Sequence, residues 1–388
     1  MHRMEPLLPI TIPTKLLDMA DEVRVKAAQL QAILPLETAE IIGKLLRVTS
    51  SFYSNLIEGR FTEPVKLSES LPKRTKEELR DLAITHMVVQ DRLERTVDAR
   101  PDIPFHLWFS PDFQRHVHTR LFRGADPSDL LTVNGQEIVP GKFRDIDVQV
   151  GTHLAPEHSA VLGMMQRLYE FYRKEQDFRR QLIAVFAFHH RVAWVHPFAD
   201  GNGRTTRLVT HMQLYKLGLA SDLWSLSRGL AKRQSDFYER LNVADMPRYT
   251  STDGRGALTE RGLIEFIEFM LEVSLDQLTY MLSVLDRDRL RDNLERAVHF
   301  DEKFVKAGIV PGAGRALYIL LSQGSVRRAD FKDYLGCGKR MASEQLTKLI
   351  ELGVVRSETE KARVITPGLP LWFALDVFPG LIKQVAQP

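Results

Sequence analysis

The residue types with the most chemical potential gather in residues 196–207, His-Pro-Phe-Ala-Asp-Gly-Asn-Gly-Arg-Thr-Thr-Arg. Gly201 and Gly203 flank Asn202, so the backbone can adopt positive φ angles and turn its N–H groups inward. The pattern after Arg204 predicts a helix that begins near Gly203, and a helix N-terminus with free N–H groups is an anion site. The segment therefore predicts a phosphate site. It is not a P-loop, because no Gly-Lys-Ser/Thr follows the glycines.

The side chains of this stretch suit phosphate-group transfer. Arg204 and Arg207 are three residues apart, hence on one helical face, and both guanidiniums can bind phosphate oxygens in a forked geometry. Asp200 offers the hard oxygen ligand that Mg²⁺ takes together with substrate phosphates. His196 precedes Pro197, which favours an extended conformation at the entrance of the loop. A neutral imidazole there can take a proton from an attacking hydroxyl, a contribution of roughly 10²–10⁴ in rate.

The stretch resembles the signature of the Fic family, HPFx(D/E)GNGRxxR, at every fixed position, and residues 188–195 resemble the lead-in helix of that family. The resemblance implies a mainly α fold that transfers a nucleotide monophosphate, usually AMP from ATP, to a protein hydroxyl of Ser, Thr or Tyr. It implies that His196 is the general base, that Asp200 holds Mg²⁺, and that Phe198 is a buried anchor. The nucleotide-binding residues that it implies are Asp200, Gly201, Asn202, Gly203, Arg204, Thr205, Thr206 and Arg207, with the two arginines on the β- and γ-phosphates.

A second helix is predicted over residues 38–58, with Thr38 as its N-cap and Gly59 just beyond its end. The apolar residues at spacings of three and four that indicate it are Ile41, Leu45, Val48, Phe52 and Leu56. Glu58 falls in the last turn, where a carboxylate opposes the helix dipole, so a cation or water should compensate it. The candidates are the neighbouring Arg60 and the distant Arg207.

Residues 54–59, Ser-Asn-Leu-Ile-Glu-Gly, resemble the inhibitory motif (S/T)xxxE(G/N) that one Fic class carries N-terminal to its core. This resemblance implies that Glu58 pairs with Arg207. The carboxylate then occupies the space that the γ-phosphate of ATP needs.

A short strand is predicted where Ile146, Val148 and Val150 alternate with polar residues, after a turn at Gly141. The segment is either an ordinary surface hairpin or, by resemblance, the Fic flap, whose edge strand pairs with an extended target segment. In the second case the part closest to the nucleotide comprises Val148, Gln149, Val150 and Gly151.

Residues 237–242 resemble the Tyr-Tyr-x-x-Leu stretch that lies near the adenine in Fic proteins, with Phe237 and Tyr238 as the two aromatic residues. The alternative is that both rings are plain helix core. Some members carry an Asn that falls near Asp245 here, so the choice of nucleobase stays open.

The composition limits the class of protein. Of the 388 residues, 53 are basic and 50 acidic, so no overall field draws the chain to nucleic acid or membrane. The single cysteine, Cys337, excludes an internal disulfide and suits a reducing compartment. The first ten residues lack a signal-peptide core, and no apolar run reaches roughly 18 residues, so a cytoplasmic location is expected. The spacing of His189, His190, His196 and His211 fits no zinc motif.

Four regions are predicted: an N-terminal helical region (1–104, with helices at 14–34 and 76–98 and a loop at 59–75), a catalytic core (105–285), a helical linker (286–312) and a C-terminal domain (313–388). Within the core, helices are expected near 157–173, 178–193, 203–217 and 263–285, with a loop at 247–262.

The C-terminal domain resembles a winged helix-turn-helix, with helices at 315–321, 328–335 and 339–352 and a two-stranded wing at 353–366. Met341, Leu346, Leu349 and Ile350 are expected to face inward. Two partners stay open: DNA, contacted by Lys339, Arg340 and Lys348, or a protein, including a second copy of the chain. Residues 324–366 contain nine basic and six acidic side chains, an excess of three, which is small for phosphate binding.

Three functions agree with this sequence. The first is a Mg²⁺-dependent adenylyltransferase that acts on target proteins and on itself. The second is a transcriptional or interaction protein that only senses nucleotide, and the third is a kinase, in which a reversed nucleotide makes His196 direct attack at the γ-phosphate. An intact His196 favours an enzyme, because a sensor needs no general base there.

Overall fold

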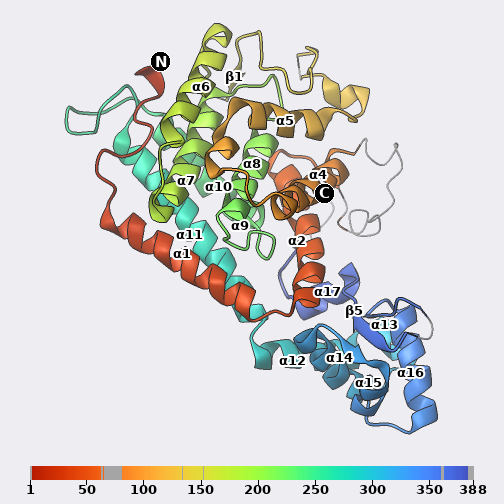
Figure 1. The fold of residues 1–388 in the computed structure, drawn as a ribbon. Helices are drawn as coiled ribbons and strands as arrows, with labels where there is room; N and C mark the ends of the chain where they lie inside the picture. Colours follow the sequence, from red (N-terminus) through yellow and green to blue (C-terminus); the bar gives the residue numbers. More distant parts are fainter. Residues whose placement is uncertain are drawn as a thin grey trace.

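The computed structural model describes residues 2–62, 64, 81–132, 134–151, 153–359 and 362–382. The fold is mainly α, as predicted (Figure 1). The helices of the N-terminal and central parts are α1 (Thr14–Ala32), α2 (Leu36–Ile57), α4 (Leu82–Ala99), α5 (Pro111–Phe122), α6 (Val161–Tyr172), α7 (Phe178–Val195), α8 (Asn202–Lys216), α9 (Leu226–Lys232), α10 (Gln234–Asp245) and α11 (Glu260–Val284).

Helix α7 forms the centre of the core. Its residues from Leu182 to Val192 are all buried, as expected of a helix whose apolar side chains surround its whole circumference. Helices α1, α6, α8 and α11 pack around it. Asp177 caps its N-terminus by accepting a hydrogen bond from the Arg180 amide. The long buried helix ends one residue before His196, so the core places this histidine rigidly.

Helix α2 runs from the C-terminal segment to the helical core (Figure 1). It begins at Leu36 after Pro35, so the predicted N-cap at Thr38 is wrong. The Thr38 hydroxyl instead donates to the Leu321 carbonyl of α14 (Gly312–Gln323), 2.7 Å away. At its other end, Glu58 is the C-cap residue and Gly59 adopts φ +71°, as predicted for a residue just past a helix.

The helix predicted at 76–98 is confirmed from Leu82 onward. Helix α4 begins at Leu82, and residues 76–80 of the predicted helix, like most of the predicted loop at 59–75, lie outside the described residues.

No helix among the described residues has both the length and the apolar character that crossing a membrane requires.

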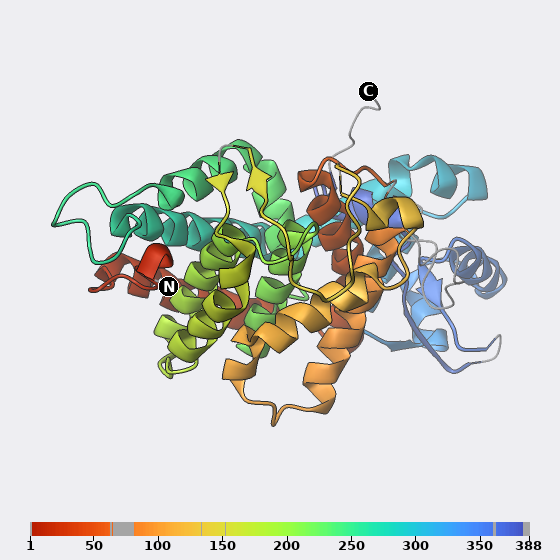
Figure 2. The ribbon, with the colours of Figure 1, turned by 90° about the horizontal axis from the view of Figure 1, so that it is seen from above.

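The flap is a small hairpin of β1 (Gln149–Val150) and β2 (His153–Leu154), which pair antiparallel with Val150 opposite His153. Figure 2 shows the hairpin as two yellow arrows at the edge of the helical core. The predicted strand from Ile146 is too long. The Ile146 carbonyl accepts from the Arg144 guanidinium (2.7 Å) and the Asp147 carboxylate accepts from the His158 amide (2.8 Å), so side-chain contacts replace strand pairing there.

After α12 (Arg287–Phe300) and α13 (Glu302–Ala307), the C-terminal segment runs α14, β3 (Val326–Arg327), α15 (Arg328–Tyr334), α16 (Lys339–Glu351), β4 (Val355–Arg356), β5 (Val364–Pro367) and α17 (Leu371–Val377). The strands form an antiparallel sheet of order β3-β5-β4.

The predicted inward position of Met341 in α16 is wrong, because its side chain is 51% exposed. The residues of this helix that are buried are Ala342, Gln345, Leu346 and Leu349, a helical stripe to which position 341 does not belong. Lys339 and Arg340 are exposed at the start of α16, whereas Lys348 pairs with Glu344 at 2.9 Å.

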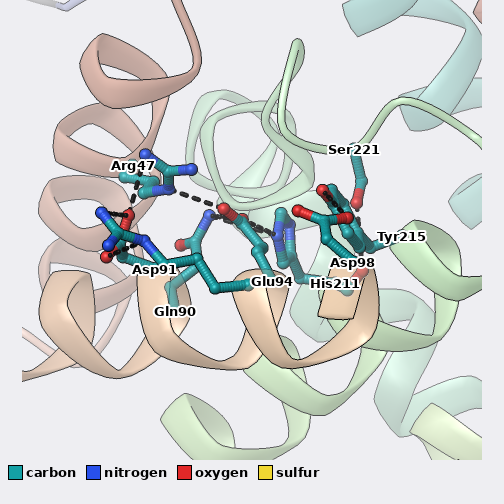
Figure 3. A network of polar contacts seen from close by, with 9 residues as sticks. Arg47, Gln90, Asp91, Glu94, Asp98, His211, Tyr215 and Ser221 are labelled. Carbon is teal, nitrogen blue, oxygen red and sulfur yellow. Dashed lines mark hydrogen bonds and ion pairs between the residues drawn. The ribbon is translucent and has the colours of Figure 1, made fainter. Parts of the chain in front are cut away.

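A buried polar network ties α2, α4 and α8 together (Figure 3). The carboxylate of Glu94 in α4, 1% exposed, accepts from Arg47 of α2 at 2.6 Å and from His211 of α8 at 2.7 Å. Gln90 donates to the same carboxylate at 2.8 Å. Burial by itself would raise the pKa of Glu94, but the His211 hydrogen bond and the Arg47 charge lower this pKa overall. An ionised carboxylate therefore joins three helices, two of which lead to the candidate site.

We expect Glu94→Ala to lower the free energy of unfolding by about 3–5 kcal/mol, because Arg47 and His211 would keep buried donors without their acceptor. Urea denaturation followed by circular dichroism measures this. Glu344→Ala, which removes an exposed partner of Lys348, is the control and should change little. Equal midpoints for the two variants would contradict a stabilising role for the network.

Candidate active site

The loop between α7 and α8 has two left-handed residues at its ends. Gly201, the N-cap of α8, has φ +75°, and a Cβ there would lie 2.3 Å from the Phe122 ring. His196 has φ +50°, so the extended conformation predicted from Pro197 is wrong. The reason is tertiary. The His196 amide closes α7 on Val192 and its carbonyl accepts from Arg144 Nε at 2.8 Å.

Gly203 is helical and has no positive φ, contrary to the expectation for a glycine-flanked turn. What it supplies is space. A Cβ at this position would lie 2.2 Å from Glu58 Oε1. The Glu58 carboxylate therefore rests on the first turn of α8, where only a glycine leaves room for it.

Asn202 gives the loop its shape. Its side-chain oxygen accepts from the Phe198 amide and its side-chain nitrogen donates to the Phe198 carbonyl, both at 2.8 Å. Phe198 is 1% exposed and stacks on His118 with ring centroids 4.0 Å apart, which is the buried anchor that was predicted. The amide of Asn202 is thus engaged within the loop.

These elements enclose a cavity of about 520 Å³, within the usual range of ligand sites. Predicted site residues in its lining are Glu58, Val150, Gly151, His196, Asn202, Gly203, Thr206, Arg207, Phe237 and Tyr238. The lining also includes residues that sequence reasoning left out or left open, namely His153, His189, Ala193, Trp194, Leu241, Asn242 and Asp245. The predicted residues outside the lining are Val148, Gln149, Asp200, Gly201, Arg204 and Thr205.

The Glu58–Arg207 pair crosses this cavity. Arg207 Nη2 donates to Glu58 Oε1 at 2.6 Å and to the Ser54 carbonyl at 2.7 Å, and its side chain is 3% exposed. Burial alone would raise the pKa of Glu58, but the charge and hydrogen bond of Arg207 lower it overall. The alternative partner, Arg60, pairs with Asp129 instead. Arg207 is therefore the cation that compensates Glu58.

The two aromatic residues of α10 differ in role. Phe237 is 3% exposed and belongs to the core as well as to the cavity wall. Tyr238 is 43% exposed, and its hydroxyl donates to the Ile57 carbonyl of α2 at 3.1 Å. Gln234 donates to the same carbonyl at 3.2 Å. Side chains of α10 thus satisfy the open C-terminal end of α2.

Arg204 and Arg207 point to different neighbours although they share a helical face. The Arg204 guanidinium lies 4.9 Å from the Phe122 ring centroid and 3.8 Å from Asp200 Oδ2. Its Nε and Nη1 atoms are buried and have no hydrogen-bond partner among the residues that the structure describes. A buried guanidinium with open donors suits an anionic ligand.

Asp200 fits the metal that the sequence predicts. Its side chain is 38% exposed, and one carboxylate oxygen accepts from the Gly201 amide. The other carboxylate oxygen, Oδ2, faces Arg204 and lies 3.8 Å from its Nη2. One accessible carboxylate is enough for a Mg²⁺ ion that arrives with substrate phosphates.

His196 is neutral at physiological pH. Its packed surroundings lower its pKa to about 4, and a hydrogen bond to the backbone of Ala193 opposes this only in part. A neutral imidazole that donates through one nitrogen keeps a lone pair on the other. That lone pair makes the ring a proton acceptor in the cavity.

Sequence reasoning missed Arg144. This buried guanidinium donates to the carbonyls of His196, Ile146 and Pro156, and so ties the base of the flap to the loop. The sequence marks it only as one arginine among 53 basic residues. Its partners are backbone carbonyls from distant segments, which no local pattern identifies.

Residues 108–214 match the family model described as Fic/DOC family. This part of the chain therefore carries a Fic/DOC family domain. The chain is 33% identical over 103 residues to "Protein adenylyltransferase Fic" of Culex quinquefasciatus, a match that covers 26% of this chain and 19% of the relative. It is 25% identical over 211 residues to the Aedes aegypti protein of the same name, covering 52% and 37%. The chain thus spans well under half of the length of these relatives.

Solved structures share the fold of this chain. A Fic family protein from Desulfovibrio desulfuricans G20 superposes with a TM-score of 0.53 at 18% identity, over 93% of this chain and 98% of that one. Fic-1 from C. elegans, residues 134–508, superposes with a TM-score of 0.50 at 16% identity, over 70% and 72%.

The low pKa of His196 has a consequence for stability. Unfolding restores an ordinary imidazole, which binds a proton as pH falls below about 6.5, whereas the folded group stays neutral down to about 4. The unfolded state then binds more protons, so stability is lost as pH falls through this window. We expect His196→Asn, a residue that tolerates positive φ, to reduce this loss by about 1.4 kcal/mol per pH unit. Urea denaturation at pH 7, 6 and 5 measures it, and parallel slopes for parent and variant would refute the neutral imidazole.

Proposed function

We propose that this protein transfers AMP from ATP to Ser, Thr or Tyr hydroxyls of target proteins and of itself, and that Glu58 restrains the reaction. The observation that carries the proposal is the Glu58 carboxylate on the first turn of α8, bound to Arg207 in the same cavity as a neutral His196. A carboxylate in this place marks an anion site, and the imidazole beside it is ready to accept a proton. The adenylyltransferase names of the relatives support the same reaction.

In this reaction His196 takes the proton of the target hydroxyl while its oxygen attacks the α-phosphorus. The bond from that phosphorus to the oxygen bridging to the β-phosphate breaks, and pyrophosphate leaves. The first N–H groups of α8 face the phosphates, and Arg204 and Arg207 bind the β- and γ-groups. Asp200 would hold Mg²⁺, which supplies positive charge to the phosphates when bound.

The flap provides a place for the target segment. Gln149 and Val150 of β1 are exposed, and the hairpin has only two residues in each strand. An extended target segment that pairs with this edge brings its hydroxyl toward His196 through main-chain hydrogen bonds. This mode accepts many sequences, because backbone groups supply most of the contact.

The restraint is competition between two anions. The Glu58 carboxylate and the γ-phosphate both require Arg207 and the positive end of α8. They carry like charge, so each disfavours the other beside this guanidinium. ATP must therefore displace Glu58 before its α-phosphate can face His196.

We expect Glu58→Gly to raise the incorporation of AMP into the protein at least tenfold, because Arg207 becomes free for the nucleotide. Intact-mass spectrometry after incubation with ATP and Mg²⁺ measures the product. Glu40→Gly makes the same change at an exposed position of the same helix and serves as the control. Equal incorporation by the two variants would argue against an inhibitory Glu58.

In the Glu58→Gly background, His196→Ala should lower the rate of AMP incorporation by roughly 10²–10⁴, the range for loss of a general base. The mass of the product separates the alternatives. Addition of a phosphate in place of AMP identifies a kinase, and no addition by Glu58→Gly itself identifies a nucleotide sensor. An undiminished rate in His196→Ala would exclude the histidine as the base.

A further inference from the structure

We propose that His153 of the flap and Asp245 of α10 form a clasp that holds the flap over the nucleotide cavity, which makes His153 a positioning residue for the reaction. The proposal rests on the proposed function, since it concerns the same cavity. It assigns a task to two lining residues that come from different elements, β2 and α10.

The clasp consists of contacts from one imidazole to two other elements. His153 Nδ1 lies 3.2 Å from Asp245 Oδ2, and His153 Nε2 lies 2.8 Å from the Trp194 carbonyl at the end of α7. Both His153 and Asp245 line the cavity. The flap itself has a ladder of only two residue pairs, so a side-chain tie of this kind contributes much of its anchoring.

Both ring nitrogens of His153 face acceptors, one a carboxylate oxygen of Asp245 and the other the Trp194 carbonyl. A single ring therefore joins the flap to α10 and to the end of α7.

A second histidine contacts the same carboxylate. His190 Nε2 of α7 lies 3.2 Å from Asp245 Oδ1 and 3.2 Å from the Leu241 carbonyl, while its Nδ1 lies 2.8 Å from Arg191 Nη1 and so accepts. Burial lowers the pKa of His190, which favours its neutral form. On the cavity side, the charge of His153 helps to lower the pKa of His196.

This arrangement links flap position to nucleotide affinity. With the clasp formed, β1 and β2 are held against α10 and α7 around the cavity. With the clasp broken, the flap keeps its base contacts through Arg144 but loses its tie at the opening. The expected effect is therefore on the KM for nucleotide more than on kcat, since His196 and the phosphate site stay in place.

The test uses the full chain with Glu58→Gly. We expect His153→Ala and Asp245→Ala each to raise the KM for ATP about tenfold, the loss of one charge-assisted hydrogen bond, with little change in kcat. The KM of the double variant should be no higher than the higher of the two single-variant values, because both changes break the same pair. His158→Ala is the matched control: it removes a histidine just beyond the flap hairpin, which pairs with Asp147 and does not line the cavity.

A second readout separates the clasp from an effect on nucleotide binding alone. Independently of activity, amide hydrogen exchange of peptides that contain Val150 and His153 should speed up in His153→Ala without nucleotide. Unchanged exchange together with an unchanged KM overturns the clasp. Failure of Glu58→Gly to transfer AMP overturns the proposed function instead, and the exchange data alone then decide the clasp.

Discussion

One ion pair, Glu58 with Arg207, joins the end of α2 to α8 within the candidate site. The carboxylate lies at the carbonyl end of α2, where the helix dipole disfavours a negative charge, and at the amide end of α8, where the dipole favours it. The pair therefore stabilises an end-to-end approach of two helices that would otherwise expose unsatisfied groups. Its stability depends on the absence of a side chain at Gly203.

The remaining contacts of α2 keep this pair in register. Arg47, about three turns before Glu58, is tied to α8 through the buried Glu94 and His211. At the C-terminal end, Tyr238 and Gln234 of α10 cap the Ile57 carbonyl. At the N-terminal end, Thr38 is bonded to α14 of the C-terminal segment. A helix held at three levels is a rigid support for a single carboxylate, and it places the C-terminal segment in direct contact with the helix that carries Glu58.

The catalytic loop and the flap are positioned differently, by side chains that bond to backbone carbonyls. Arg144 donates hydrogen bonds to carbonyls of the flap base and of the His196 loop. The Asn202 side chain forms hydrogen bonds with the backbone of Phe198 in the same loop. Regular strand pairing contributes only two residues per strand. A site built in this way can keep His196 fixed while the flap edge stays available to an incoming segment.

The sequence by itself determined the local chemistry, because residues 196–207 are contiguous and the loop carries its own turn and anchor. Candidate roles for His196, Asp200 and Arg207 could be predicted from this segment, and the pairing of Glu58 with Arg207 from a resemblance to a short motif. Only the tertiary structure decided which partners these groups meet. The divergence of Arg204 from Arg207, the left-handed His196, the contact of Thr38 with Leu321 and the outward Met341 all follow from packing between segments far apart in the chain. Arg144 and the His153–Asp245 pair were invisible for the same reason, since a hydrogen bond between distant elements leaves no periodic trace in the sequence.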